Sequence, residues 1–445
     1  GATSIEVSGT SNIGADITTT NNQTYTGAVT MSGGNRILRS NSGTINNGST
    51  INGGGNNLTI TGNLHVDDAI SNTAIFSVSG TTDLGANVTT SGTQTYSGAV
   101  TLSDAARTLT TTGDTVTFTG TVNGTQDLTV NTTSGDSSAA TVQFASTVGD
   151  TTKVGAILIT GNLNLDGNII KTLDSSAGAT SIEVTGTSDL GANVKTTGDQ
   201  TYTGNATISA DITLTGGLQL TFAGTVNSSV NGEGATDNDA LSTSFTETAF
   251  EGEVGDTYGL GVIIITGDLD LDNDITSATS LSVSENTNLA ADVTTRGTQT
   301  YGDDATSDTV TLETAINFTT TDSNITFNSI VDSNNTTPKA ITIDMDNSGA
   351  GPDGTVTFAG VVGTNEDVAA IGITGNLDLN AAIGNGATAG ATSIEVSGTS
   401  NIGADITTTN NQTYTGAVTM SGGNRILRSN SGTINNGSTI NGGGN

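Results

Sequence analysis

Acidic residues spaced two apart are the part of this chain best suited to chemistry. The segment GDLDLDND carries Asp268, Asp270, Asp272 and Asp274. If the segment is a strand, alternate side chains lie about 7 Å apart on one face, where a hard cation such as Ca²⁺ would relieve the repulsion between carboxylates. The competing interpretation, which we favour, is a solvated acidic face without a specific ion. Ca²⁺ stays open as the alternative, and no other cofactor is expected.

A second candidate cation site lies in DMDNSGAGPDGT. It opens like a calcium-binding loop, with Asp344, Asp346 and Ser348 in the first ligand positions. However, Thr355 stands where the closing glutamate of such a loop belongs. The segment therefore lacks a ligand that the motif requires, and we assign no metal-binding residue.

The most acidic and least regular stretch covers residues 231–256. Its acidic residues are Glu233, Asp237, Asp239, Glu247, Glu251 and Glu253. As an exposed loop it could dock cations or a neighbouring fibre. A plain insertion between two structural repeats needs fewer assumptions, and this is the interpretation we favour.

The single histidine does not stand in a catalytic setting. His65 occupies a position that holds Asn164, Asp270 and Asp378 in the other copies of its phrase. A position that accepts these three residue types is most simply an outward, solvated strand position, without a catalytic or ligand role.

Basic residues are too few and too scattered to complete an active site. Arg36 and Arg39, repeated as Arg425 and Arg428, are the only closely paired ones, and we expect them to neutralise an acidic neighbouring strand. A β-helix hydrolase or lyase would need carboxylates beside Arg, Lys or His in a groove. A serine without a base is only a hydroxyl. We expect no catalytic residue and no enzymatic activity.

The composition favours a thin-cored, all-β protein. The 445 residues include no Trp or Cys, two Pro and only 3% aromatic residues, so the core must consist of Val, Ile, Leu and Ala. A net charge of −33 repels nucleic acid and anionic lipid and suits an extracellular, salt-screened medium. No apolar run reaches the roughly 18 residues of a membrane span, so no membrane insertion is expected.

The chain repeats itself. Residues 1–56 and 390–445 are identical, which gives a period of 389 residues, 1–389, and suggests a window from a longer periodic chain. Diverged copies of the opening phrase divide the period into four sub-repeats. Their approximate bounds are 4–76, 77–180, 181–279 and 280–389.

One short interval recurs inside every copy. A Gln-Thr-Tyr tripeptide marks each copy, with its tyrosine at Tyr25, Tyr96, Tyr202, Tyr301 and Tyr414. A valine precedes each tyrosine by a constant interval of 18 in the numbering, as Val7 precedes Tyr25. The intervals between successive tyrosines vary from 71 to 113. A constant short spacing inside copies of variable length indicates a small stacking unit with loop insertions.

We therefore predict one continuous β-solenoid over residues 1–445, a right-handed parallel β-helix with coils of about 18–22 residues and variable loop insertions. Alternation in TVTFTGTV places Val116, Phe118 and Val122 inward, and Gly and Asn supply the corners. A tandem array of immunoglobulin-like sandwiches is the rival, but it predicts modules of constant length and larger core residues.

Open ends of a solenoid expose strand edges, which should stack onto another copy. Self-association, end to end or lateral, is thus the expected partnership. Flat ranks of outward Thr on a solenoid face also resemble ice-binding proteins, although no strict Thr-x-Thr column recurs in every coil and ordinary β-propensity explains Thr as well.

The phrases NQTYTGAVTM, TQTYSGAVTL and VTFTGTV resemble those of very large bacterial β-strand-repeat proteins grouped with filamentous haemagglutinin-like adhesins. The likeness spans nearly the whole chain and rests on low-complexity motifs. It implies secretion, a right-handed β-helix and a surface role in attachment or fibre building. It carries over no catalytic residue, and the amino-terminal secretion domain and membrane anchor of the family are not in this sequence.

The sequence thus predicts an extracellular or cell-surface structural protein, a β-solenoid fibre serving as filament, sheath or adhesin stalk, in contact with itself and with a cellular, host or abiotic surface. A binding module with an ice-binding or glycan-binding face is the first alternative. A polysaccharide-active β-helix enzyme is the second. Thermal hysteresis, glycan binding or polysaccharide turnover would distinguish these classes.

Overall fold

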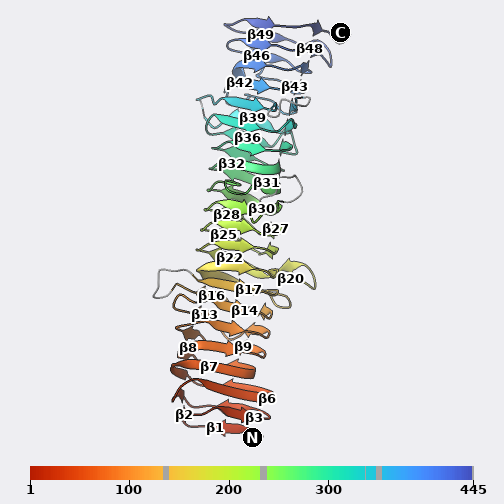
Figure 1. Ribbon diagram of the computed structural model, residues 1–445. Coiled ribbons are helices and arrows are strands. Elements are labelled where there is room, and N and C mark those ends of the chain that lie inside the picture. The colour runs from red at the N-terminus through yellow and green to blue at the C-terminus, as the bar shows by residue number, and fades with distance from the viewer. Residues whose placement is uncertain (134–139, 231–237, 336, 347–352, 443–445) are drawn as a thin grey trace. The chain divides into compact units, whose positions relative to one another are not determined.

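The computed structural model describes residues 1–133, 140–230, 238–335, 337–346 and 353–442. Every regular element in these ranges is a β-strand (Figure 1). The chain divides into two compact units, Gly1–Leu218 and Gln219–Asn445, which are described separately.

Unit 1 consists of short strands. They are β1 (Ile5–Val7), β2 (Ser11–Ile13), β3 (Ile17–Thr19), β4 (Gln23–Tyr25), β5 (Val29–Met31), β6 (Arg36–Asn47), β7 (Ile51–Val66), β8 (Ile70–Val78), β9 (Thr82–Leu84), β10 (Val88–Thr90), β11 (Gln94–Tyr96), β12 (Val100–Leu102), β13 (Arg107–Thr110), β14 (Val116–Phe118), β15 (Val122–Asn123), β16 (Leu128–Asn131), β17 (Thr141–Phe144), β18 (Val154–Thr160), β19 (Asn162–Leu165), β20 (Ile170–Lys171), β21 (Ser176–Ala177), β22 (Ala179–Val184), β23 (Ser188–Leu190), β24 (Val194–Lys195), β25 (Gln200–Tyr202), β26 (Ala206–Ile208) and β27 (Ile212–Thr215).

Unit 2 is built in the same way. Its strands are β28 (Gln219–Phe222), β29 (Val226–Ser228), β30 (Leu241–Phe250), β31 (Leu260–Leu271), β32 (Ile275–Val283), β33 (Thr287–Leu289), β34 (Val293–Thr295), β35 (Gln299–Tyr301), β36 (Thr309–Leu312), β37 (Ile316–Thr319), β38 (Ile325–Phe327), β39 (Ile330–Ser333), β40 (Ile341–Asp344), β41 (Thr355–Phe358), β42 (Val368–Thr374), β43 (Asn376–Leu379), β44 (Ala391–Val396), β45 (Ser400–Ile402), β46 (Ile406–Thr408), β47 (Gln412–Tyr414), β48 (Val418–Met420), β49 (Leu427–Ser429), β50 (Ile434–Asn436) and β51 (Ile440–Asn441).

Successive strands of unit 1 visit three parallel ladders in turn. β4 pairs with β1, β5 with β2 and β6 with β3, and we name these ladders A, B and C. In the first coil Val7 pairs with Tyr25, so the constant interval between valine and tyrosine in the sequence is one full turn. Such a coil is three strands of three residues, each followed by a three-residue corner. The predicted β-solenoid is confirmed, and this recurring interval is its shortest coil.

Longer coils keep the ladders and extend the corners. Val116 pairs with Val142 in unit 1, an interval of 26 in the numbering, and Ile325 pairs with Val356 in unit 2, an interval of 31. Both coils are longer than 18–22 residues because of the variable loop insertions that the sequence also predicts. The insertions leave the strand register intact because a corner adds residues outside the ladder.

The core is a set of inward columns, as the alternation in the sequence predicts. Val116, Phe118 and Val122 are fully buried. In ladder C, Phe118 stacks on the ring of Tyr96 at a centroid distance of 5.2 Å and on Phe144 at 5.1 Å. Stacked rings add attraction beyond the apolar area that they bury, so the few aromatic residues are used where they reinforce one another.

The sub-repeats do not follow one ladder. Tyr25 belongs to ladder A, Tyr96 to ladder C and Tyr202 to ladder B. Each copy of the Gln-Thr-Tyr phrase in unit 1 is therefore shifted by one ladder relative to the copy before it. The same outward residues consequently appear on three faces in turn and form no long array on one face.

One corner of unit 1 is closed by glycines stacked coil upon coil. A Cβ atom on Gly80 would overlap the backbone of Gly62, one on Gly98 that of Gly80, and one on Gly120 that of Gly98. Because none of the three upper glycines has a positive φ, the requirement is space between coils and not backbone conformation.

We predict that Gly98→Ala lowers the free energy of unfolding by about 1–3 kcal/mol, because the new methyl group must push two coils apart. Gly372→Ala is the matched control, since a Cβ there meets no atom within 4 Å. Urea denaturation measures both, and equal midpoints for the two variants would contradict the stacking explanation.

Candidate functional site

The Gln-Thr-Tyr phrase builds a buried polar cluster. Gln94 is fully buried, and its amide donates to the carbonyls of Val88 at 3.2 Å and Thr110 at 2.9 Å and to the Thr90 hydroxyl at 3.3 Å. The Tyr96 hydroxyl donates to the Gln94 side-chain oxygen at 3.0 Å. One glutamine thus links a tyrosine, a threonine and the backbone of the next coil.

The same cluster recurs in all the other copies, around Gln23, Gln200, Gln299 and Gln412. Burial raises the pKa of Tyr25 to about 12, so its hydroxyl stays a donor at neutral pH. The phrase recurs because its side chains provide hydrogen-bond partners for the buried polar groups of a corner. Sequence reasoning used the tyrosine as a marker and missed the buried glutamine, although the two-residue alternation places both on the same side.

His65 lies on the outer face, as expected, with 37% of its side chain exposed. Its side chain has two close carboxylate neighbours, which a simply solvated position would not require. Its Nε2 lies 2.6 Å from Asp67 and its Nδ1 lies 2.9 Å from Asp83, the residue with which it is paired on the next coil. The imidazole therefore bridges two carboxylates of adjacent coils.

The same outward position is a register pair in every copy of its phrase. One partner is an aspartate and the other is an asparagine or the histidine, in the pairs His65–Asp83, Asn164–Asp189, Asp270–Asn288 and Asp378–Asn401. In two of these pairs the amide donates directly to the carboxylate, at 3.0 Å and 2.7 Å. At this position the residues that coincide one coil apart are thus donor and acceptor, not like charges.

The predicted row of four carboxylates is broken by a corner. Asp268 and Asp270 lie in β31, which ends at Leu271, whereas Asp272 and Asp274 lie beyond it. Asn286 donates to Asp268, and Asn288 donates to both Asp270 and Glu313. Partial burial, with the nearby charges of Asp270 and Glu313, raises the pKa of Asp272. Asp268 and Asp270 are thus held by side-chain amide donors of the next coil.

No group of three or more His, Cys, Asp or Glu side chains placed to hold a metal ion occurs in the described ranges. Of the calcium-like loop, residues 347–352 lie outside these ranges. Asp344 and Asp346 are described, and the Asp346 amide donates to the Asp344 carboxylate at 3.2 Å. Specific Ca²⁺ binding stays the untested alternative to a solvated acidic face.

The acidic stretch 231–256 contains a strand. Residues 231–237 lie outside the described ranges, but β30 covers Leu241–Phe250 and pairs with β31. Glu247 on its outer side accepts a hydrogen bond from Gln219 at 2.8 Å. Part of the expected insertion is therefore a wall of the solenoid.

The paired arginines bind carbonyl groups. Arg36 donates to the carbonyls of Ser32 at 2.9 Å and Asn35 at 2.6 Å, and Arg425 repeats this with Ser421 and Asn424. The expected ion pair with an acidic strand is not among the described contacts of Arg36 and Arg425. These arginines close their own turns.

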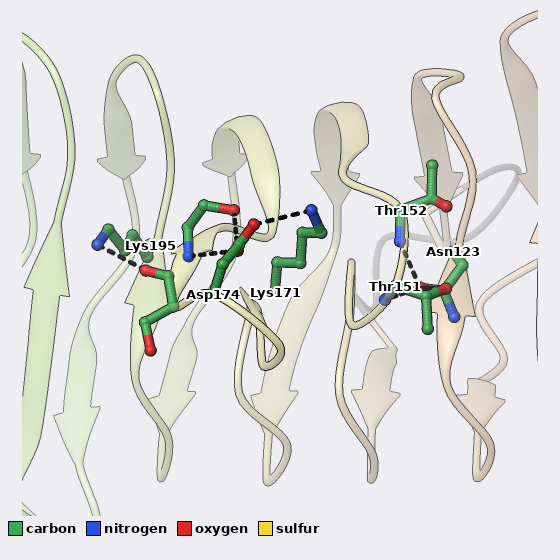
Figure 2. Close-up of polar contacts among 8 residues, drawn as sticks. Asn123, Thr151, Thr152, Lys171, Asp174 and Lys195 are labelled. Carbon is green, nitrogen blue, oxygen red and sulfur yellow. Dashed lines mark hydrogen bonds and ion pairs between the residues drawn. The ribbon is translucent and has the colours of Figure 1, made fainter.

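The structure brings together three lysines that sequence reasoning treated as scattered. Lys153, Lys171 and Lys195 belong to successive coils of unit 1, at the corner that leads from ladder A to ladder B. Figure 2 shows Lys171 and Lys195. The coils around them span intervals of 21 and 25 in the numbering, from Val148 to Ile169 and from Ile169 to Val194. The lysines stand at different distances from these paired residues, so the recurring interval of 18 does not predict the cluster.

No family model, curated protein or solved structure matches this chain. Within the described residues there is also no helix that could span a membrane.

We predict that Gln94→Leu lowers the free energy of unfolding by about 2–3 kcal/mol, since it leaves a buried hydroxyl and a carbonyl without their partner. Gln126→Leu, at a glutamine that is only partly buried, should change it by less than about 0.5 kcal/mol. Urea denaturation measures both. A Gln94→Leu variant as stable as the wild type would show that the cluster does not stabilise the coil.

Asp272→Asn should raise the denaturation midpoint at neutral pH. Because the folded-state pKa of Asp272 is raised, its contribution to stability is present below the unfolded pKa of about 4 and is lost as the pH rises through the folded value. The advantage of the variant should therefore vanish below about pH 4. Asp114→Asn, which also replaces an aspartate by asparagine, is the control. A stability advantage of Asp272→Asn that does not change with pH would contradict the charge explanation.

Proposed function

We propose that the chain is an extracellular structural repeat protein whose β-solenoid serves as the scaffold of a filament, sheath or adhesin stalk. The scaffold needs long, uniform stacking and a water-compatible exterior. Both units supply these with stacked parallel coils, inward aliphatic columns and outward hydroxyl, amide and carboxylate groups.

The observation that carries the proposal is the identical 56-residue segment, which occurs in two settings. Ile45 and Ile51 are buried under the strands of the following coil, whereas their equivalents Ile434 and Ile440 are 43% and 58% exposed. The same sequence thus buries its aliphatic residues as soon as a coil stacks upon it. A further coil on Ile434 and Ile440 would gain this apolar burial.

The opposite side of the same segment behaves alike. Ile5 and Val7 are half-buried in β1, and their equivalents Ile394 and Val396 are fully buried against β42. Both sides of a coil are therefore suited to being covered by another coil, from the same chain or from a second copy in end-to-end self-association. The net charge of −33 opposes it at low salt.

The scaffold explains the chemistry of the outer face better than the alternatives. Asp268 and Asp270 of the candidate row accept hydrogen bonds from the side-chain amides of Asn286 and Asn288 in the next coil. The outward hydroxyl column of Thr59, Ser77, Thr95 and Thr117 is one residue wide and is followed by Gln143, which does not favour an ice-binding plane.

The test is sedimentation and electron microscopy of the purified chain in low salt, in 150 mM NaCl and with millimolar Ca²⁺. We expect linear assemblies that increase with salt. The double variant Ile434→Asp and Ile440→Asp should need about tenfold or more protein to assemble, because it buries charge instead of aliphatic surface.

Ile264→Asp is the matched control, since Ile264 is also 43% exposed but lies in the middle of a stack. It should assemble like the wild type. Monomers at every salt concentration, or turnover of a polysaccharide by the purified chain, would refute the scaffold function.

A further inference from the structure

One groove of unit 1 differs in charge from the rest of this acidic chain. It has a volume of about 470 Å³ and is lined by eleven residues, none of them acidic. Lys153 and Lys171 contribute ammonium groups, Thr125, Thr180 and Thr197 contribute hydroxyls, and Val154 and Ala177 contribute apolar surface. The groove therefore combines positive charge and hydrogen-bonding groups with a lining surface that is mostly apolar.

The corners of successive coils build the walls of the groove. Asn123 accepts hydrogen bonds from the amides of Thr151 at 2.8 Å and Thr152 at 3.3 Å, which fixes one wall (Figure 2). The opposite wall is the hairpin of β20 and β21, an antiparallel pair inserted into the corner. The groove is thus held by backbone contacts on both sides before any ligand binds.

The lysines are only partly neutralised. Lys171 forms an ion pair with Asp174 at 2.9 Å. Lys153 instead bonds the Thr197 hydroxyl at 3.4 Å, and Lys195 bonds the Ser175 carbonyl of the hairpin at 2.7 Å. In a chain with 43 acidic residues, Lys153 in the groove and Lys195 at the hairpin leave local positive charge, because their described contacts include no carboxylate.

The lysines are also specific to this copy of the corner. In the aligned segments VGDTTKVG, VGDTYGLG and VGTNEDVA, the position of Lys153 is taken by Gly259 and Asp367. In the third of these segments, burial and the charge of Asp332 raise the pKa of Asp367. The corresponding corner is therefore acidic. The stacking of coils consequently does not require a lysine here.

We propose that this groove binds a carbohydrate unit that carries a single carboxylate or sulfate group, with the lysines on the anion and the threonines on the ring hydroxyls. The surrounding charge of −33 repels a long polyanion but tolerates one charge held between ammonium groups. Threonine and backbone groups match the closely spaced hydroxyls of a sugar. This binding goes beyond the scaffold function and does not depend on assembly.

The test is an NMR titration of the full chain with glucuronate, glucose and inorganic sulfate. We expect glucuronate to shift signals of the groove and to bind at least tenfold more tightly than glucose and than sulfate. Lys153→Gln with Lys171→Gln should weaken glucuronate binding about tenfold or more. Lys339→Gln, which removes the one lysine of the chain outside this cluster, should leave it unchanged.

Other outcomes would overturn the proposal. Binding of sulfate as tight as that of glucuronate would reveal an anion site without sugar recognition. Absence of glucuronate shifts at millimolar concentration, or unchanged affinity in a double lysine variant that melts like the wild type, would exclude the groove. Self-association that is lost in this double variant, without glucuronate binding, would assign the lysines to contacts between copies.

Discussion

Direct superposition of successive coils is the constraint on which the rest of the structure depends. Strands in a parallel ladder lie about 4.8 Å apart, so every inward residue must fit the residue one coil below, and every outward residue must tolerate the one beside it. Inside, this produces columns such as Tyr96, Phe118 and Phe144. At the corners it leaves room only for glycine at positions such as Gly80 and Gly98.

The same constraint shapes the acidic exterior. Like charges directly opposite each other in a ladder are destabilising, and this chain carries a large excess of them. Several register pairs join a carboxylate to an amide, as in Asp270 with Asn288 and Asp378 with Asn401, although Glu247 lies opposite Asp268. Acidic surface and tight stacking therefore coexist because asparagine donates hydrogen bonds where a second aspartate would repel.

Much of the fold could be predicted from the sequence, because stacking imposes spacing. The interval between Val7 and Tyr25 is one coil, and alternation places Phe118 inward. The ladder of each copy could not be predicted, since it depends on how many strands the variable insertions contain. The lysine cluster could not be predicted either, because the coils around it differ in length, and its groove depends on the hairpin of β20 and β21, whose antiparallel form no periodic pattern indicates.

The shift of the Gln-Thr-Tyr phrase from ladder A to C to B bears on how such a chain can evolve. The three walls accept the same phrase, so the smallest interchangeable part is a strand with its corner, six residues in the shortest coils. A gene could then gain or lose multiples of this hexapeptide without breaking the stack. Unequal recombination between copies would change the length of the molecule in fine steps and distribute any new surface residue around the three walls.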